Sequence, residues 1–146
     1  MKISVLGKNN IDQFMELIRV FEKTFEMENF TMPDRAHLQM LLEKEDFFAI
    51  AAEKETRIVG GLSVYVLHQY YSIKPLAYMF DLAVLPECQR QGIGGKLVAF
   101  AVNFCREQGF EEMFVQADKI DAHAVNFYRK TNPSGEEDVY HYTYAL

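Results

Sequence analysis

Residues 79–97 read MFDLAVLPECQRQGIGGKL, and this stretch decides the fold. An apolar strand pattern from Met79 to Val84 runs into a glycine-rich turn, which opens an amphipathic helix. The first N–H groups of a helix have no acceptor within the helix and lie at the positive end of its dipole. We therefore predict a cradle for a phosphate or pyrophosphate, in which Cβ atoms are kept away by Gly92, Gly94 and Gly95.

The spacing of this turn argues against two common nucleotide-binding loops. A P-loop requires a Ser or Thr directly after its Gly-Lys pair, whereas Leu97 follows Lys96. A dinucleotide-binding turn of the form G-x-G-x-x-G that starts at Gly92 requires its third glycine at position 97, where the sequence has Leu97. The pattern that remains is Gln89-x-x-Gly92-x-Gly94.

The length and composition predict one globular domain spanning residues 1–146. Apolar residues make up 49% and charged residues 25% of the chain, which are ordinary proportions. No apolar run approaches the ~20 residues that cross a bilayer, and no signal-peptide core follows the start, so we expect a cytoplasmic protein. Cys88 and Cys105 are expected to be free thiols.

The formal net charge of −6 and the absence of a Lys/Arg run argue against a nucleic-acid partner, and without a long apolar run no membrane partner is expected. A cationic small molecule is the expected partner instead. An anion in the predicted cradle would find its local cations in Arg90 and Lys96.

Hydrophobic periodicity predicts an α/β (α+β) fold in the order β-α-α-β-β-β-α-β-α-β, with helices on both faces of one mixed sheet. The predicted strands are residues 1–6, 47–53, 58–69, 76–84, 112–117 and 140–145. Four helices are predicted, beginning near Asn9 or Asn10, at Pro33, at Gly92, and at Asp121 or Ala122.

This order, with the cradle after the fourth strand, resembles the GCN5-related N-acetyltransferase (GNAT) superfamily. More narrowly, the chain is similar to type I aminoglycoside 3-N-acetyltransferases from about Leu41 to His141. The residues that carry the similarity are Phe48-Ala49, Ala51-Ala52, Val59-Gly60, Tyr65-Val66-Leu67, Asp81-Leu82-Ala83-Val84, Arg90-Gln91-Gly92-Ile93, Val115-Gln116-Ala117-Asp118, Asp121, Ala124-Val125, Tyr128, Lys130, Glu136-Glu137 and Val139.

The resemblance implies a resistance-type enzyme that transfers acetyl from acetyl-CoA directly to the 3-amino group of an aminoglycoside, without a covalent intermediate. It implies that strand amides receive the thioester arm, and that the turn holds the pyrophosphate. The implied donor-binding residues are Leu82, Ala83, Val84, Gln89, Arg90, Gln91, Gly92, Ile93, Gly94, Gly95 and Lys96. No metal is expected, because the four histidines and two cysteines show no metal-binding spacing.

Asp81 and Tyr128 are the candidate catalytic residues. A carboxylate in the apolar run around Asp81 is costly to bury unless it is paired or lines a cleft. Strand alternation places Asp81 opposite to Phe80 and Leu82 unless a bulge intervenes. By resemblance Asp81 orients or deprotonates the amine, and Tyr128 donates a proton to the leaving thiolate. The alternatives are a structural bond for Asp81 and core packing for Tyr128.

A second group of residues is expected to bind the acceptor together with Asp81. Acidic side chains after the fifth predicted strand and beyond the last helix suit a polycationic amine, although acids in loops are commonly just solvated. Tyr65 is expected either to stack on a sugar ring or to pack in the core. The acidic candidates are Asp118, Asp121, Glu136 and Glu137.

Two rival functions remain open at this point. One keeps the enzyme but changes the acceptor to a polyamine, another small amine or a peptide N-terminus. The other is a non-catalytic CoA-binding module. A homodimer is expected only by analogy with the superfamily.

Overall fold

A computed structural model describes all 146 residues, which form two compact units, residues 1–116 and residues 117–146. Each unit is described separately. The elements of the first unit are β1 (Lys2–Leu6), α1 (Ile11–Thr24), α2 (Arg35–Glu43), β2 (Phe47–Lys54), β3 (Arg57–Leu67), β4 (Leu76–Val84), the short 3₁₀ helix η1 (Pro86–Cys88), α3 (Ile93–Glu107) and β5 (Glu112–Val115). The second unit contains α4 (Ala122–Arg129).

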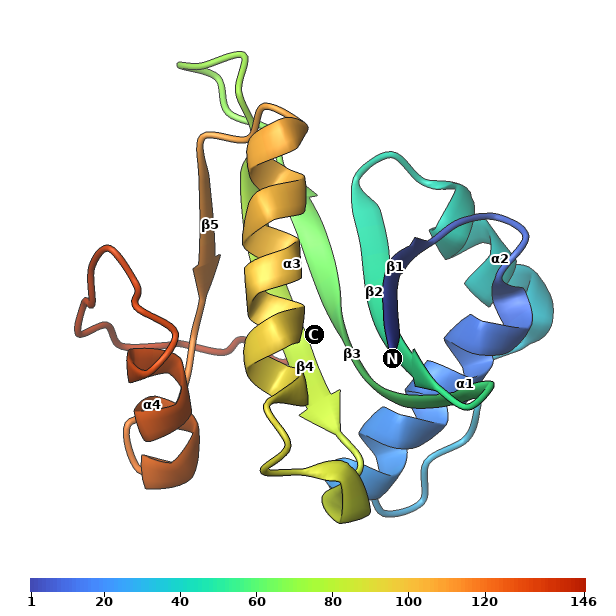
Figure 1. Cartoon of the computed structure of the whole chain (residues 1–146). Coiled ribbons are helices and arrows are strands. Elements are labelled where there is room, and N and C mark those ends of the chain that lie inside the picture. The colour runs from blue at the N-terminus through green and yellow to red at the C-terminus, as the bar shows by residue number, and fades with distance from the viewer. The chain divides into compact units, whose positions relative to one another are not determined.

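The five strands form one sheet in the order β1-β2-β3-β4-β5. Neighbouring strands from β1 to β4 are antiparallel, whereas β4 and β5 are parallel and are connected through α3 (Figure 1). The β2–β3 hairpin closes through Glu55 and Thr56, whose φ values of 51° and 66° provide the twist of a tight two-residue turn. The sheet is therefore mixed, as the sequence predicts.

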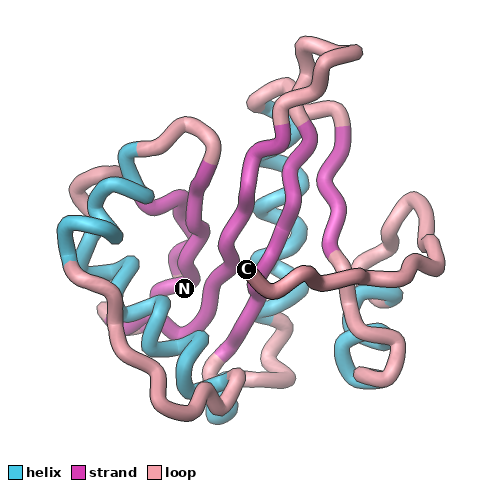
Figure 2. Tube along the Cα trace, turned by 180° about the vertical axis from the view of Figure 1, so that it is seen from behind, coloured by secondary structure: helices cyan, strands magenta, loops and turns pink.

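Helices of the first unit cover both faces of this sheet. On one face, which we call the α1 face, Phe14 of α1 lies 5.9 Å from Phe47 of β2, measured between ring centroids. On the other, the α3 face, Phe104 of α3 lies 5.2 Å from Phe48, the next residue of β2. Figure 1 shows α3 in front of the strands, and the reverse view in Figure 2 shows the strands in front of α3.

The core consists of the side chains that these helices press onto the sheet. Its largest fully buried members are Leu17, Ile50, Leu62, Val64, Met79 and Leu97. Cys105 on α3 is also buried, and burial raises the pKa of its thiol to about 11. Cys88 is half-buried, and neither cysteine forms a disulfide.

In the second unit, α4 begins at Asp121, whose side-chain Oδ1 accepts a hydrogen bond from the Ala124 N–H at 3.0 Å. Residues after Arg129 form neither helix nor strand. The predicted strand at residues 140–145 is therefore wrong. Alternating tyrosines supply the pattern of a strand, but Tyr140, Tyr142 and Tyr144 are exposed and residues 140–145 are irregular.

The remaining elements are confirmed, with shifts of a few residues at their ends. The second helix begins after Asp34 rather than at Pro33, because the Asp34 carboxylate accepts a hydrogen bond from the His37 N–H at 2.8 Å. None of the helices has the length and apolar character required to cross a membrane.

Gly61 of β3 provides a test of how tightly α1 packs. A Cβ atom at this position would lie 2.5 Å from Leu17 Cδ1 and 2.5 Å from the Ile50 carbonyl oxygen. We expect Gly61→Ala to lower the free energy of unfolding by about 1–3 kcal/mol, since the backbone cannot move aside as a flexible side chain would. Gly135→Ala is the matched control, because nothing lies within 4 Å of its Cβ position. Equal urea midpoints for the two variants would contradict this packing.

Candidate active site

A bulge in β4 is the central feature of the candidate site. Leu62 of β3 pairs with Leu82, and Val64 pairs with Met79. Ser63 alone therefore faces two residues of β4, Phe80 and Asp81. The Asp81 N–H donates a hydrogen bond to Ser63 Oγ at 3.2 Å, which ties the bulge to the only buried polar side chain of the core.

The bulge sets the side chain of Asp81 on the α1 face. The contact between Gly61 and Leu17 of α1 shows that position 61 of β3 faces α1. Gly61 pairs with Ala83, so Ala83 of β4 lies on the same face. Side chains on one strand share a face at every second position, so Asp81 shares the face of Ala83. The bulge thus interrupts the alternation of side chains along β4 that the sequence predicts.

Phe80 lies on the same face, although it is the residue next to Asp81. Tyr65 of β3 pairs with Tyr78, and Tyr65 contacts Phe47 on the α1 face at 5.4 Å between ring centroids. Phe80 is two residues from Tyr78 on the near side of the bulge, so it also belongs to this face. Two consecutive residues of β4 therefore present their side chains together.

The environment of Asp81 suits a proton acceptor. Its side chain is half-buried, and burial raises the pKa of the carboxyl above its ordinary value. Within residues 1–116 its carboxylate has no hydrogen-bond or ion-pair partner. A half-buried carboxylate without a partner is costly, which is typical of residues retained for chemistry rather than for stability.

Beyond the bulge, one edge of β4 is not paired with any strand. β5 pairs with β4 only from Leu76 to Met79. The Leu85 N–H donates to the Val59 carbonyl of the neighbouring β3 at 2.8 Å, so the alternate residues Leu82 and Val84 direct their backbone groups to the opposite edge. Ala83 directs its backbone N–H and C=O groups toward β3.

On this open edge, the carbonyl of Val84 is hydrogen-bonded by the side chains of Gln89 and Thr24. The Val84 carbonyl accepts hydrogen bonds from Gln89 Nε2 at 3.0 Å and from Thr24 Oγ1 at 3.5 Å. The Gln89 side chain therefore closes the turn onto the end of β4. The N–H groups of Leu82 and Val84 remain available to an acceptor atom.

The glycine-rich turn has the geometry of an anion cradle. Gly92 is the N-cap of α3 with φ of 78°, a left-handed conformation that favours glycine, and no side chain caps the helix. The first bond of the helix is donated by the Lys96 N–H to the Gly92 carbonyl at 3.1 Å. The amides of Ile93, Gly94 and Gly95 precede it and have no acceptor within the helix.

Space and charge around the turn fit a pyrophosphate. No atom lies within 4 Å of a Cβ position built at Gly92 or Gly95, so the approach to the amides is open. A cavity of about 170 Å³ is lined by Gln91, Ile93 and Lys96 of the turn together with Met1 and Lys54. The residues present therefore fit the phosphate portion of CoA.

An ion-pair cluster anchors the start of the turn. Glu87 of η1 lies 3.2 Å from Lys23 of α1 and 3.2 Å from Arg57 of β3, measured between side-chain nitrogen and carboxylate oxygen. A hydrogen bond to its own backbone and its contacts with Lys23 lower the pKa of the Glu87 carboxyl. Arg90 follows in a left-handed conformation with φ of 59°, which turns the chain toward α3.

The second unit carries the other predicted site residues. Tyr128 on α4 contacts Phe127 at 5.0 Å between ring centroids. Asp121 caps α4, and Asp118 accepts a hydrogen bond from the Ile120 N–H at 3.2 Å. Arg129 holds Glu136 through two hydrogen bonds of 2.8 and 3.1 Å, which lowers the pKa of Glu136. Glu137 is exposed.

The structure thus brings together Asp81, Tyr65, the open edge of β4 and the glycine turn within the first unit. Sequence reasoning did not identify Phe80 or Ser63 as part of this site. The signal available was the polar Ser63 within an apolar strand opposite a polar Asp81, which is consistent with a bulge but does not specify its position. No group of three or more His, Cys, Asp or Glu side chains is arranged to hold a metal ion.

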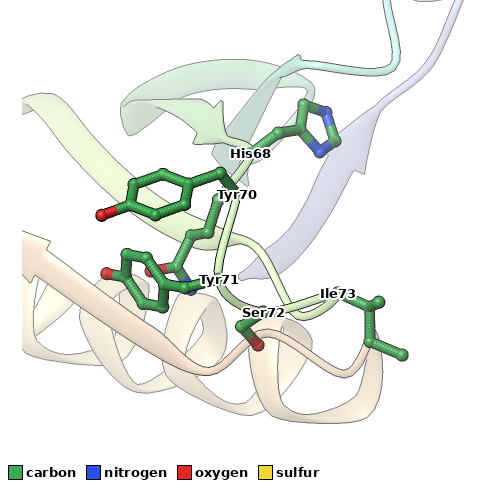
Figure 3. A pocket seen from close by; sticks show the side chains of 6 residues that line it. His68, Tyr70, Tyr71, Ser72 and Ile73 are labelled. Carbon is green, nitrogen blue, oxygen red and sulfur yellow. The ribbon is translucent and has the colours of Figure 1, made fainter.

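A second hollow lies at the other end of β4. It has a volume of about 500 Å³ and is lined by residues 68–73 of the β3–β4 loop (Figure 3). Tyr70 and Tyr71 lie edge to face at 5.0 Å and are 98% and 68% exposed. This loop precedes β4 whereas the glycine turn follows it, so the hollow is separate from the candidate site.

Comparison with known proteins agrees with this geometry. Residues 12–132 match the family described as Acetyltransferase (GNAT) family, which is more than half of the chain. The chain therefore belongs to the GNAT acetyltransferases, whose α+β fold it has. Members of this family use acetyl-CoA.

Among solved structures, the chain is 54% identical to the aminoglycoside acetyltransferase meta-AAC0020 from an uncultured soil metagenomic sample, which was crystallised with sisomicin and with trehalose. That match has a TM-score of 0.97 and covers 99% of this chain and 95% of the other. The aminoglycoside acetyltransferase HMB0005, from a similar sample, is 31% identical with a TM-score of 0.90, covering 100% and 99%. The uncharacterized N-acetyltransferase YhfO of Bacillus subtilis (strain 168) is 23% identical over 107 residues, 73% of this chain and 72% of that protein.

The burial of Asp81 generates a prediction about stability. Its raised pKa means that ionisation opposes folding, so the cost is present above the folded-state pKa and vanishes below the ordinary value of about 4. We expect Asp81→Asn to raise the thermal midpoint at pH 7 by about 1–4 °C. The difference should disappear as the pH falls through 4. A variant that is less stable than the wild type at pH 7 would show that the carboxylate has a favourable partner.

Proposed function

We propose that this protein is an acetyl-CoA-dependent N-acetyltransferase that acetylates the 3-amino group of an aminoglycoside, acting as a single domain over residues 1–146. The observation that carries the proposal is the β4 bulge, which sets a carboxylate without a partner in residues 1–116 beside an open strand edge that leads to an anion cradle. The match to the GNAT family runs across both units, which supports treating them as parts of one catalytic domain.

The donor would lie along β4 and the start of α3. In this proposal the backbone amides of the turn from Gln89 to Gly94 bind the pyrophosphate, and the side chains of Arg90 and Lys96 balance its charge. The outward N–H of Leu82 or Val84 binds the thioester arm and polarises the thioester oxygen. Backbone donors fixed by the fold need no rearrangement during the reaction, which is the main advantage of such a site.

Asp81 would prepare the acceptor for attack. An alkylamine has an ordinary pKa of about 10 and arrives as an ammonium ion, which an ionised carboxylate within ~4 Å can hold. Asp81 first accepts one proton from the ammonium ion, which leaves the amine nitrogen a lone pair to form its bond to the thioester carbon. The nitrogen loses its second proton as the tetrahedral adduct collapses, and this proton replaces the one that the thiolate takes from Tyr128. A raised pKa makes the carboxylate a stronger base, which favours the first of these transfers.

The leaving group requires one further proton. When the thioester C–S bond breaks, the electron pair remains on sulfur, and we assign Tyr128 as the donor that protonates this thiolate. A phenol with a pKa near 10 is protonated at neutral pH and can donate without prior ionisation. No covalent enzyme intermediate is needed, because the amine attacks the thioester directly.

The acceptor class is supported by charge and by the relatives. The chain carries a net charge of −6, and Asp118, Asp121, Glu136 and Glu137 are candidates to contact a polycation. Arg129 already neutralises much of the charge of Glu136, so Asp118 and Glu137 are the stronger candidates. The 54% identical relative was crystallised with the aminoglycoside sisomicin. The 3-position is proposed from the resemblance to type I 3-N-acetyltransferases alone.

Free-thiol release from acetyl-CoA tests the proposed function. We expect turnover with sisomicin or gentamicin, and much less with spermidine or a peptide carrying a free N-terminus. Asp81→Asn should reduce kcat by about 100-fold or more and leave the acetyl-CoA affinity within threefold. Mass and NMR analysis of the product would locate the acetyl group. Thiol release only with spermidine or the peptide would change the acceptor, and tight CoA binding without release from any amine would indicate a non-catalytic module.

Gly92→Asp tests the cradle. The carboxylate would place negative charge at the pyrophosphate and a side chain on a residue with φ of 78°, so we expect acetyl-CoA affinity to fall by more than tenfold. Gly109→Asp is the matched control, since Gly109 has φ of 81° and lies past the other end of α3. Both substitutions carry similar backbone strain, and calorimetry should show loss of binding only at Gly92. Equal affinities for the two variants would move the donor site away from this turn.

A further inference from the structure

An aromatic row crosses the α1 face beside Asp81. Its members are spaced at 4.7–5.9 Å between ring centroids and come from α1 and from four neighbouring strands. The term aromatic row refers below to six residues, which are Phe14, Phe47, Tyr65, Phe80, Tyr78 and Phe114.

Exposure rises along this row from the helix toward Asp81. Phe14 and Phe47 are 4% and 7% exposed because they form the contact with α1. Tyr65 is 41% exposed, and Phe80 is 55% exposed. Tyr65 and Phe80 are in contact, so together they expose one continuous apolar surface beside a carboxylate, which is more informative than a single exposed apolar side chain.

Phe80 is held in place without being covered. Tyr65 and Tyr78 each lie 5.6 Å from it, at interplanar angles of 90° and 79°, so neither ring is stacked parallel on Phe80. Tyr78 is fixed in turn by a parallel stack with Phe114 at 4.7 Å and by a 2.8 Å hydrogen bond from its hydroxyl to Gln116 Oε1. The row therefore presents Phe80 as a preorganised ring with open surface.

We infer that Phe80 is the specificity-determining residue for the acceptor, forming a platform on which a cyclic polyol amine lies flat while its amino group reaches Asp81. This inference rests on the proposed function and deepens it. It selects amines carried on a six-membered ring, such as an aminocyclitol or aminosugar, over linear polyamines and peptide N-termini.

The stereochemistry of such a ring matches the site. A cyclitol or pyranose with equatorial substituents has two flat faces made of axial C–H bonds, and its amines project from the edge. The C–H face suits the negative face of an aromatic ring. Residues 80 and 81 follow one another and share a face, so an amine at the ring edge can reach the carboxylate while the ring covers Phe80.

The charge of the acceptor adds to this selection. An ammonium group near an aromatic face is attracted to it, most strongly where water is excluded. Asp81, the residue next to Phe80, supplies a carboxylate that has no partner within residues 1–116. A linear polyamine could use the carboxylate but has no flat C–H face for the ring.

Three substitutions at Phe80 separate these contributions. Phe80→Leu keeps an apolar side chain without a π face, Phe80→Tyr keeps the ring, and Phe80→Ala removes both. Tyr70→Ala is the matched control, because Tyr70 is 98% exposed in the β3–β4 loop at the far end of β4. The substrates are sisomicin and spermidine, with kcat and KM from thiol release and sisomicin affinity from calorimetry.

We expect Phe80→Leu and Phe80→Ala to raise KM and the dissociation constant for sisomicin at least tenfold. Their kcat and their KM for acetyl-CoA should stay within threefold of the wild type. Phe80→Tyr and Tyr70→Ala should resemble the wild type for both substrates. The ratio of kcat/KM for sisomicin to that for spermidine should fall at least tenfold in Phe80→Leu.

Equal losses for sisomicin and spermidine would overturn the inference, because they would make Phe80 a general apolar contact. Unchanged sisomicin affinity with a lower thermal midpoint would also overturn it, and would indicate that this chain's own residues cover Phe80. A wild-type protein that binds sisomicin through Phe80 but releases no thiol would refute the proposed acetyl transfer while leaving the platform intact. The calorimetric result therefore separates the two claims.

Discussion

The candidate site depends on one mismatch in the sheet, where Ser63 of β3 faces both Phe80 and Asp81 of β4. Without the extra residue, strand alternation would place Asp81 on the face opposite to Phe80, among the side chains packed against α3. With it, the carboxylate and the ring lie together on the α1 face. The hydrogen bond from the Asp81 N–H to Ser63 Oγ replaces the backbone partner that the bulge removes.

The donor portion of the site is built from backbone rather than from side chains. The edge of β4 beyond Met79 is free because β5 is only four residues long, and the turn after β4 leads directly to the open amides of α3. Such a site constrains backbone conformation more than side-chain identity. Gly92 is the exception, because its left-handed conformation and the space above it both favour a residue without Cβ.

Several unfavourable features are concentrated around this site. They include a half-buried carboxylate without a partner within residues 1–116, an unpaired strand edge, an exposed phenylalanine and left-handed backbone conformations at Arg90 and Gly92. The interior of the sheet, in contrast, is closely packed, with Leu17 against Gly61 and Phe48 against Phe104. This division is typical of enzymes, in which the core offsets the cost of a preorganised site.

The sequence by itself determined the elements from β1 to α4, the hairpin, and the glycine turn at the start of α3, because hydrophobic periodicity and turn residues are local signals. It also identified Asp81 as a carboxylate that needs a special environment. The tertiary structure decided on which face Asp81 lies, that Phe80 lies beside it, and that Leu82 and Val84 rather than Ala83 face the open edge. It also decided that residues 140–145 form no strand. These outcomes depend on register and on pairing with other strands, which are relations between distant segments that a local pattern does not contain.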